Sequence, residues 1–244
     1  GTVLLLCAAF TLLASVGVLA VNPFAMKDVG YAPQDFAPIT LAVDFSNVIV
    51  VHPSVPAQSL ADYLALARQG PDGMTYGTSG VGSAGHLAGE LLKSMSGARL
   101  THAPYRGGGP AMNDLVGGHV PSVIASAPTA TGFMRDGRIR ALAMTGPHRS
   151  PFDPDVPTVA ELGFPGYAAT NWYAFVVASR TPTEYVAILN SLLTRALALP
   201  EVRGAFAKQG METLPGTPQE AAAHFERERA VWKKVIADSG LRLE

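Results

Sequence analysis

The residues best suited to chemistry form one glycine- and hydroxyl-rich stretch, Met74-Thr75-Tyr76-Gly77-Thr78-Ser79-Gly80-Val81-Gly82-Ser83-Ala84-Gly85-His86-Leu87. The pattern predicts a short strand, a turn and the start of an amphipathic helix. Amide groups in the first turn of a helix lack partners within the helix and lie at the positive end of its dipole. Thr78, Ser79 and Ser83 add hydroxyl donors. We therefore expect the turn to bind a carboxylate or a phosphate, the alternative being that Ser79 or Ser83 is only a helix N-cap.

Two later turns are expected at the same end of the sheet. His102–Pro110 links a strand to a helix, with Pro110 at the first helical position. Within it, Tyr105 and Arg106 are candidates to face the ligand; Arg106 would complement a carboxylate, or would simply be solvated at the loop tip. A third turn, at Ser126, begins another helix. Because ligands gather beyond the carboxyl ends of strands in open α/β sheets, these turns can converge.

Other chemistries fit this sequence less well. Gly80–Gly85 reads GxGxxG, and Arg106 lies where an NADP enzyme could hold a 2′-phosphate, but the preceding strand is short and polar. A nucleophile elbow fails because Val81 replaces a required glycine around both Ser79 and Ser83. The histidines show no metal-ligand spacing, and no carboxylate pair brackets the turn. We expect no catalytic residue, no metal and no cofactor, and we expect His86 to support the loop main chain.

From residue 40 onward, short branched apolar runs alternate with capped helical stretches, which indicates a parallel or mixed α/β sheet. The expected strands are Ser46–Val51, Met74–Gly77, Leu100–Ala103, Pro121–Ala125, Ile139–Met144 and Trp172–Ala178. Ser59, Thr181 and Thr217 are predicted N-caps, the last two each followed by proline and then by glutamate at the third helical position. Two apolar stripes are expected in the core: Val186, Leu189, Leu193 and Leu197, and Phe225, Val231, Trp232, Val235 and Ile236.

Two predicted strands are followed by the same order of elements. Ser46–Pro53 and Asn171–Ala178 each run from an apolar strand toward a proline-containing turn and a capped helix. If both cross between lobes, residues 52–170 form one lobe, while 1–51 and 171–244 form the other. Two connecting strands allow hinge closure around a ligand, although a single continuous sheet would show the same periodicity. Asn171 and Trp172, where the second strand begins, are further candidate ligand contacts.

The amino-terminal run Thr2–Val21 carries no charge over twenty positions. Such a length could span a bilayer. Gly17 and Asn22-Pro23 instead favour a buried strand, a turn and a short helix. The basic region of a signal peptide does not precede the run, and a chain that opens inside a strand is expected to be truncated.

The charge balance argues against nucleic acid. There are 18 basic and 19 acidic residues, a formal net charge of −1, and no basic stripe. A single cysteine, Cys7, rules out an internal disulfide and any multi-cysteine metal site. A hydrophobic fraction of 48% excludes a disordered chain.

Several motifs in order resemble one family: Tyr76–Glu90, Thr101–Gly107, Asp114–Val120, Arg138–Thr145, Asp155–Gly163 and Thr217–Trp232. Together they resemble the extracytoplasmic substrate-binding proteins of tripartite tricarboxylate transporters, also called Bug-type receptors. The resemblance implies a two-lobed, type II-like periplasmic binding protein fold in the α/β class, with two hinge strands and, here, a truncated first lobe. It also implies a periplasmic, monomeric receptor that captures a small carboxylate, delivers it to membrane permease subunits and has no enzymatic activity.

By position in that family, Ser79, Gly80, Gly82, Ser83 and Ala84 match the anion contact of the second lobe, and Tyr105 matches the family's HVPY-type turn. The sequence departs from the family near Ser126, where the family commonly carries an acidic residue and this chain has Ala125-Ser126-Ala127. Two alternatives stay open at this point: an NADP-linked oxidoreductase that uses Gly80–Gly85, and a truncated remnant that does not bind.

Overall fold

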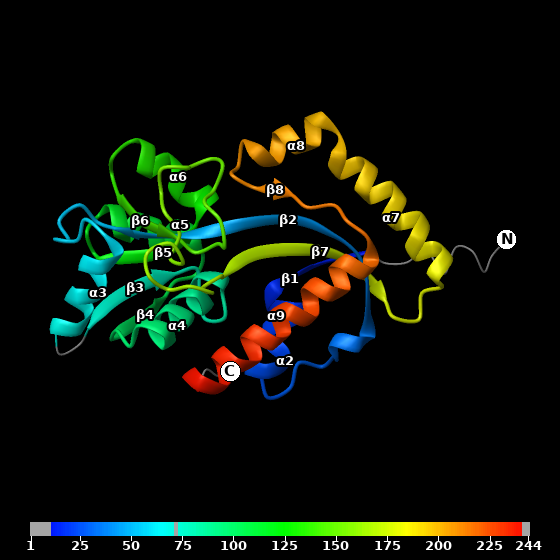
Figure 1. Ribbon diagram of the computed structural model, residues 1–244, viewed down its shortest axis with the longest axis horizontal. Coiled ribbons are helices and arrows are strands. Elements are labelled where there is room, and N and C mark those ends of the chain that lie inside the picture. The colour runs from blue at the N-terminus through cyan, green and yellow to red at the C-terminus, as the bar shows by residue number, and fades with distance from the viewer. Residues whose placement is uncertain (1–10, 71–72, 241–244) are drawn as a thin grey trace. The chain divides into compact units, whose positions relative to one another are not determined.

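The computed structural model describes residues 11–70 and 73–240. The chain splits into two compact units: unit 1 is Gly1–Asp44 with Trp172–Glu244, and unit 2 is Phe45–Asn171. Two strands run from one unit into the other, β2 (Phe36–Val51) and β7 (Thr170–Ala178), as Figure 1 shows. The first boundary therefore lies within β2 rather than at its end, where the sequence placed it.

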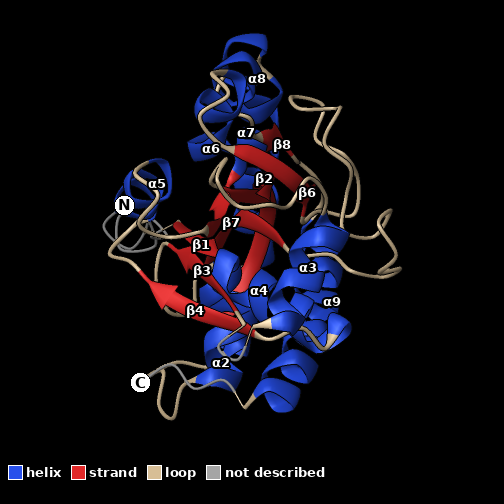
Figure 2. Cartoon of the chain, turned by 90° about the vertical axis from the view of Figure 1, so that its left-hand side faces the viewer, coloured by secondary structure: helices blue, strands red, loops and turns tan. Residues whose placement is uncertain are grey.

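Unit 2 is built on a mixed sheet. Strand β3 runs parallel to β4 and β5, whereas the second half of β2 is antiparallel to β5 and β6. Figure 2 shows β3 and β4 side by side. The elements of this unit are α3 (Leu60–Gln69), β3 (Met74–Thr78), α4 (Ala84–Ser96), β4 (Leu100–Pro104), α5 (Gly108–Val116), β5 (Ser122–Ser126), α6 (Ala127–Arg135) and β6 (Arg140–Met144).

Branched and apolar side chains explain where the core of unit 2 lies. Four consecutive residues of β2, Val48–Val51, are fully buried, and so are Ser122–Ala125 of β5. Burial of successive residues means that both faces of the sheet are covered by packed elements. Met112 and Leu115 of α5 belong to the same cluster. The core of unit 2 therefore lies against both faces of this sheet.

The helix boundaries of unit 2 follow from local signals. Ser59 caps α3, because its hydroxyl accepts the Asp62 amide at 3.1 Å while the Asp62 carboxylate accepts the Ser59 amide at 3.0 Å. Gly97 ends α4 in the left-handed conformation, with φ of 64°. The Ser59 cap was predicted from the sequence and is confirmed.

Unit 1 combines a small antiparallel pairing with long helices. Strand β1 pairs with β7, with Ala14 opposite Ala174, and β8 pairs with Val43 and Asp44 of β2. Its elements are β1 (Leu12–Ser15), the π-helical turn Gly17–Val21, α2 (Asn22–Ala25), the 3-10 turn Pro33–Asp35, α7 (Thr183–Ala198), α8 (Pro200–Ala207), β8 (Glu212–Thr213) and α9 (Pro218–Ser239).

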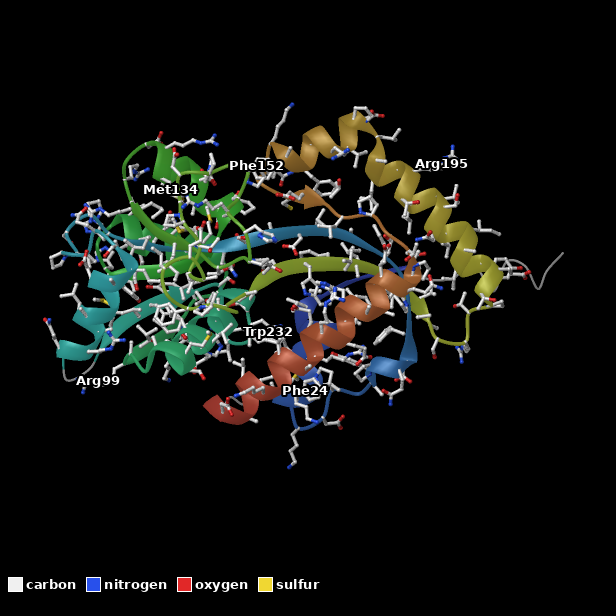
Figure 3. All side chains as sticks on the ribbon, viewed as in Figure 1. Phe24, Arg99, Met134, Phe152, Arg195 and Trp232 are labelled. Carbon is white, nitrogen blue, oxygen red and sulfur yellow. The ribbon has the colours of Figure 1, made fainter. Side chains whose placement is uncertain are left out.

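The core of unit 1 is aromatic. Trp172 of β7 stacks on Phe225 of α9 with ring centroids 5.3 Å apart. The carboxylate of Glu228 accepts the indole N–H groups of both Trp172 and Trp232, each at 3.0 Å. Trp232 lies on α9 in Figure 3. One half-buried carboxylate thereby satisfies two buried donors.

Three sequence expectations in unit 1 need correction. Helix α7 begins with Pro182, not Thr181, at the N-cap, and no side chain caps it. Of the first predicted stripe only Leu197 is fully buried, because α7 is mostly exposed; in the second stripe Val231 is 40% exposed. The Thr217 cap of α9 is confirmed, with the Glu220 amide donated to its hydroxyl at 3.1 Å.

The apolar amino-terminal run falls partly outside the described residues, which begin at Thr11. From there it forms the predicted strand, turn and short helix, and Leu19–Val21 are buried. Leu13 is nevertheless 59% exposed, so the strand is not buried throughout. Within the described part of the chain, no helix has the length and apolar character needed to cross a bilayer.

Candidate functional site

The glycine-rich turn between β3 and α4 is shaped by its two central glycines. Gly80 and Gly82 have φ angles of 142° and 74°, which side-chain-bearing residues rarely adopt. Ser83 is the N-cap of α4, and its hydroxyl accepts the His86 amide at 3.3 Å. A third glycine, Gly85, lets the helix approach the sheet, since a Cβ there would lie 2.4 Å from the Ile124 carbonyl oxygen.

The turn leaves amide groups available for a ligand. The Ser83 amide donates to the Gly80 carbonyl at 3.3 Å, and the Gly82 amide donates to His86 Nδ1 at 3.1 Å. Ala84 and Gly85 occupy the first two helical positions, where helix geometry supplies no acceptor, and the structure gives their amides none among the described residues. The Ser83 hydroxyl is an N-cap and still keeps its own proton to donate.

The second turn is fastened to the first by main-chain hydrogen bonds. The Tyr105 amide donates to the Thr78 carbonyl at 3.1 Å, and the Gly107 amide donates to the Ser79 carbonyl at 3.0 Å. Helix α5 then begins at Gly108, after Gly107 with φ of 113°. The amino-terminal ends of α4 and α5 are therefore brought together at the carboxyl ends of the parallel strands β3 and β4.

The third turn lies next to the second. Ser126 is the N-cap residue of α6, and its hydroxyl lies 3.0 Å from the Thr129 hydroxyl. A Cβ on Gly108 would lie 3.7 Å from the Thr129 methyl group, so the starts of α5 and α6 are in contact. Three helix starts thus gather within unit 2, and each contributes positive main-chain potential.

Two histidine rings support the first turn from the protein interior. His86 and His102 stack with centroids 3.8 Å apart and an interplanar angle of 12°. His102 Nε2 lies 2.6 Å from the Thr78 hydroxyl oxygen, which accepts the Gly80 amide at 3.2 Å. The expected role of His86 as a support for loop main chain is confirmed by its bond from Gly82.

The site's electrostatics favour neutral histidines. Burial lowers the pKa of His102 to about 4, with the neighbouring His86 ring a smaller cause. Burial also lowers the pKa of His86, although Glu90 opposes that shift. Glu90 is 7% exposed, and its carboxylate lies 4.0 Å from His86 Nε2 and accepts the Tyr76 hydroxyl at 3.1 Å. Near neutral pH the charge offered by the turn is therefore that of its amides.

The remaining predicted contacts are placed unevenly. The Tyr105 hydroxyl donates to Asp114 at 2.9 Å, so it is committed to α5. Arg106 is exposed in the second turn and forms no ion pair with any described residue. Asn171 donates its side-chain amide to Asn47 at 2.8 Å. Trp172 belongs to the core of unit 1, where it is 1% exposed.

Sequence reasoning missed His102, Glu90 and Tyr76. His102 is two residues into β4 and Tyr76 two residues into β3, where each reads as an ordinary strand residue. Glu90 lies four residues after His86 on α4, and that helical spacing was an available signal for a paired side chain.

A cavity of about 580 Å³ lies elsewhere in unit 2, beside β6. Met134, Phe152 and Val156 line it together with Arg135 and Arg140. Arg140 donates to the Ala57 carbonyl at 3.0 Å, and Arg135 donates to the Phe152 carbonyl at 3.3 Å. Because the structure already uses both cations and none of the predicted contacts lines this cavity, it is not the site of the three turns.

Comparison with known proteins gives one consistent result. The family model described as the tripartite tricarboxylate transporter family receptor matches residues 7–241. BugT of Bordetella pertussis is 33% identical over 238 residues, which cover 96% of this chain and 73% of BugT. A solved R. palustris protein with adipate is 35% identical with a TM-score of 0.85, covering 95% of this chain and 78% of that one. MatC from Rhodopseudomonas palustris, solved with bound malate, is 25% identical with a TM-score of 0.80, covering 93% and 78%.

Proposed function

The chain belongs to the tripartite tricarboxylate transporter receptor family, and from that membership we propose that it captures a small carboxylate on the three gathered turns of unit 2. Members of this family are substrate-binding receptors and not enzymes. Family membership therefore excludes the oxidoreductase alternative for Gly80–Gly85. The same glycines serve a turn that binds a ligand and leaves it unchanged.

One observation carries the proposal: the Gly107 amide is bonded to the Ser79 carbonyl at 3.0 Å, which joins the starts of α4 and α5. Amide donors from two helices then point into one region, with the start of α6 beside them. A carboxylate has two oxygens with about four acceptor positions. Several amides from different helix starts can therefore share one carboxylate, and charge-assisted bonds of this kind are stronger than neutral ones.

We assign a role to each candidate residue of the three turns. The amides of Ala84 and Gly85 and the hydroxyl of Ser83 are the central donors, and Ser79, Gly80 and Gly82 shape the approach to them. Thr78 holds the turn, since its hydroxyl is already bonded to Gly80 and His102. Ser126 stands at the neighbouring helix start, and exposed Arg106 supplies a cation for a second anionic group. Tyr105 acts as a wall through its ring, because its hydroxyl is bonded to Asp114.

The ligand class comes from relatives and from the donors together. The solved relatives named above carry adipate and malate, both of which are dicarboxylates. Amide and hydroxyl donors at helix starts favour a carboxylate over an uncharged solute, because the helix dipole places positive potential there. We propose that the protein works in the periplasm and presents its ligand to membrane subunits of a tripartite tricarboxylate-type transporter.

Isothermal titration calorimetry on the full chain tests the proposal. Adipate, malate and a tricarboxylate are titrated alongside adipamide, which has the same carbon skeleton as adipate and no charge. We expect heat from at least one carboxylate and none from adipamide. Folded protein that gives no heat with any carboxylate would contradict the proposal, and equal binding of adipamide would contradict the role of negative charge.

A further inference from the structure

The carboxylate site depends on how the glycine-rich turn is held, and two histidines hold it. The Gly82 amide is bonded directly to His86, and the Gly80 amide is bonded to Thr78, whose hydroxyl contacts His102. Gly82 is thus bonded directly to one ring of the stacked pair, and Gly80 is linked to the other ring through Thr78. The inference below rests on the proposed function, because it concerns the same turn.

The hydrogen bond from Gly82 fixes the protonation of the His86 ring. Nδ1 accepts the Gly82 amide at 3.1 Å, so it carries a lone pair and not a proton. The neutral ring must then carry its proton on Nε2. Nε2 faces Glu90 across 4.0 Å, and a carboxylate there favours that tautomer.

Glu90 is itself held in place. Its carboxylate accepts the Tyr76 hydroxyl at 3.1 Å, and Lys93 Nζ lies 3.5 Å from its other oxygen. His86 is 5% exposed and Glu90 is 7% exposed, so neither side chain is positioned to touch a ligand in solvent. The buried Glu90 carboxylate is thus held by the Tyr76 hydroxyl and Lys93, with one of its oxygens facing the His86 ring.

We propose that His86 is a positioning residue for the carboxylate site: Nδ1 fixes the Gly82 amide, and Glu90 fixes the tautomer that leaves Nδ1 free to accept. With the Gly82 amide turned toward the ring, the peptide between Val81 and Gly82 has one orientation. The turn then enters binding already ordered, and the ligand does not have to order it.

Two replacements of His86 separate this role from simple space filling. His86→Asn places a carbonyl oxygen near the position of Nδ1, where it can accept the Gly82 amide. His86→Gln places its amide near the position of Nε2, where it cannot. His148→Asn, at an exposed histidine of unit 2 outside the turns, is the matched control.

The first readout needs no ligand: the hydrogen exchange rate of the Gly82 amide, measured by NMR on the full chain. We expect slow exchange in the wild type, His86→Asn and His148→Asn, and markedly faster exchange in His86→Gln. The ring nitrogens of wild-type His86 are expected to show an unprotonated Nδ1, and Glu90→Gln is expected to mix the two tautomers. A protonated Nδ1 in the neutral wild-type ring would overturn the inference.

The second readout is the affinity for adipate and malate by calorimetry. We expect His86→Gln to bind about tenfold more weakly, the effect of losing one hydrogen bond near a charge, and His86→Asn and His148→Asn to stay within about threefold of the wild type. Equal affinity loss in His86→Asn and His86→Gln, or no loss in either, would overturn the positioning role. If the wild type binds no carboxylate, the proposed function fails, while the Gly82 exchange rates still decide whether His86 holds the turn.

Discussion

The Ser83 hydroxyl accepts the His86 amide at 3.3 Å, and its own proton remains to be donated. From the sequence, Ser83 was expected to be either a helix cap or an anion contact. A hydroxyl has one donor and two acceptor positions, so the geometry accommodates both. At single residues the sequence therefore named the Ser83 hydroxyl as a candidate group, whereas its hydrogen-bond partner came only from the fold.

A charge at Ser83 separates the two roles. Aspartate and asparagine both cap helices well, so we expect Ser83→Asp and Ser83→Asn to keep the melting temperature close to that of the wild type. Only aspartate places a negative charge beside the free amides, and like charges a few ångströms apart repel by about 1–4 kcal/mol. Adipate should therefore bind at least about tenfold more weakly to Ser83→Asp than to Ser83→Asn.

Calorimetry and thermal melting on the two variants check this. Similar affinities in the aspartate and asparagine variants would remove Ser83 from the vicinity of the bound carboxylate.

The stacked histidines predict a pH dependence of stability. Burial holds the pKa of His102 at about 4, below the ordinary value of 6.5. The unfolded chain therefore binds more protons than the folded chain between pH 6.5 and about 4, and stability falls as the pH falls through that window. The His86 pKa is also lowered, which acts in the same direction.

Thermal melts from pH 7.5 to 4 measure this effect, and His102→Asn isolates it. His224 in unit 1 has a lowered pKa as well, so the wild-type slope contains more than one histidine. We expect His102→Asn to be less stable at pH 7.5 but to lose less on acidification. Parallel curves for the two proteins would show that His102 does not titrate with unfolding.

At the scale of elements, sequence patterns located helices and strands well where capping signals were strong. Ser59 and Thr217 each cap the helix they were expected to begin, and Ser83, one of two alternative caps, caps α4. The expectation failed at Thr181, because Pro182 already has the extended ψ of 140° that an N-cap requires. The predicted strand Ser46–Val51 was also shorter than β2, which is Phe36–Val51. Pro38, near the start of this long strand, reads as a break when the strand's pairing partners are unknown.

The start of α4 gives a prediction that leaves the helix intact. Proline is favoured at the first helical position, and the extended Ser83 backbone, with ψ of 156°, suits a residue before proline. Ala84→Pro therefore removes one proposed amide donor without removing the helix start. We expect adipate to bind about tenfold more weakly or worse, as for a lost bond to a charged group.

The matched control is Thr183→Pro, at the first position of α7, where Pro182 precedes it with ψ of 140°. We expect this variant to bind adipate like the wild type. An Ala84→Pro protein that melts normally and binds normally would exclude the Ala84 amide from the site.

The aromatic core of unit 1 depends on one carboxylate. Glu228 accepts two indole N–H groups, and Glu228→Ala would leave both without that acceptor. Each buried donor left unpaired costs about 1–3 kcal/mol, so we expect a loss of about 2–5 kcal/mol in the free energy of unfolding of this region. Glu228→Gln retains an acceptor oxygen and should lose less.

Urea unfolding followed by tryptophan fluorescence measures this directly, because Trp172 and Trp232 both contact the substituted side chain and are the only tryptophans in the sequence. Equal stabilities for the alanine and glutamine variants would mean that the indole hydrogen bonds contribute little.

For the whole molecule, the sequence predicted two strands that run from one unit into the other. The signal was the order of elements that both segments share, an apolar strand, a proline-containing turn and a capped helix. The compact units meet at Asp44–Phe45 and Asn171–Trp172, against predicted boundaries after residues 51 and 170. The second boundary lies within one residue of the prediction, because β7 is short and begins with polar residues. The first differs by seven residues, because Phe36–Val51 is one continuous strand whose crossing point depends on contacts and not on composition.

A ligand that binds the folded chain and not the unfolded chain raises stability by mass action. With adipate at 100 times its dissociation constant, the gain is about 2.7 kcal/mol, which in a chain of this length raises the melting temperature by about 5–10 °C. Because the three turns lie in unit 2, Glu228→Ala in unit 1 should start from a lower melting temperature and still bind adipate with the wild-type affinity. Ala84→Pro should show the opposite pattern, a normal melting temperature without ligand and little rise with it. Loss of affinity in Glu228→Ala as large as that in Ala84→Pro would assign unit 1 a direct part in binding and would contradict a site built on the turns of unit 2 alone.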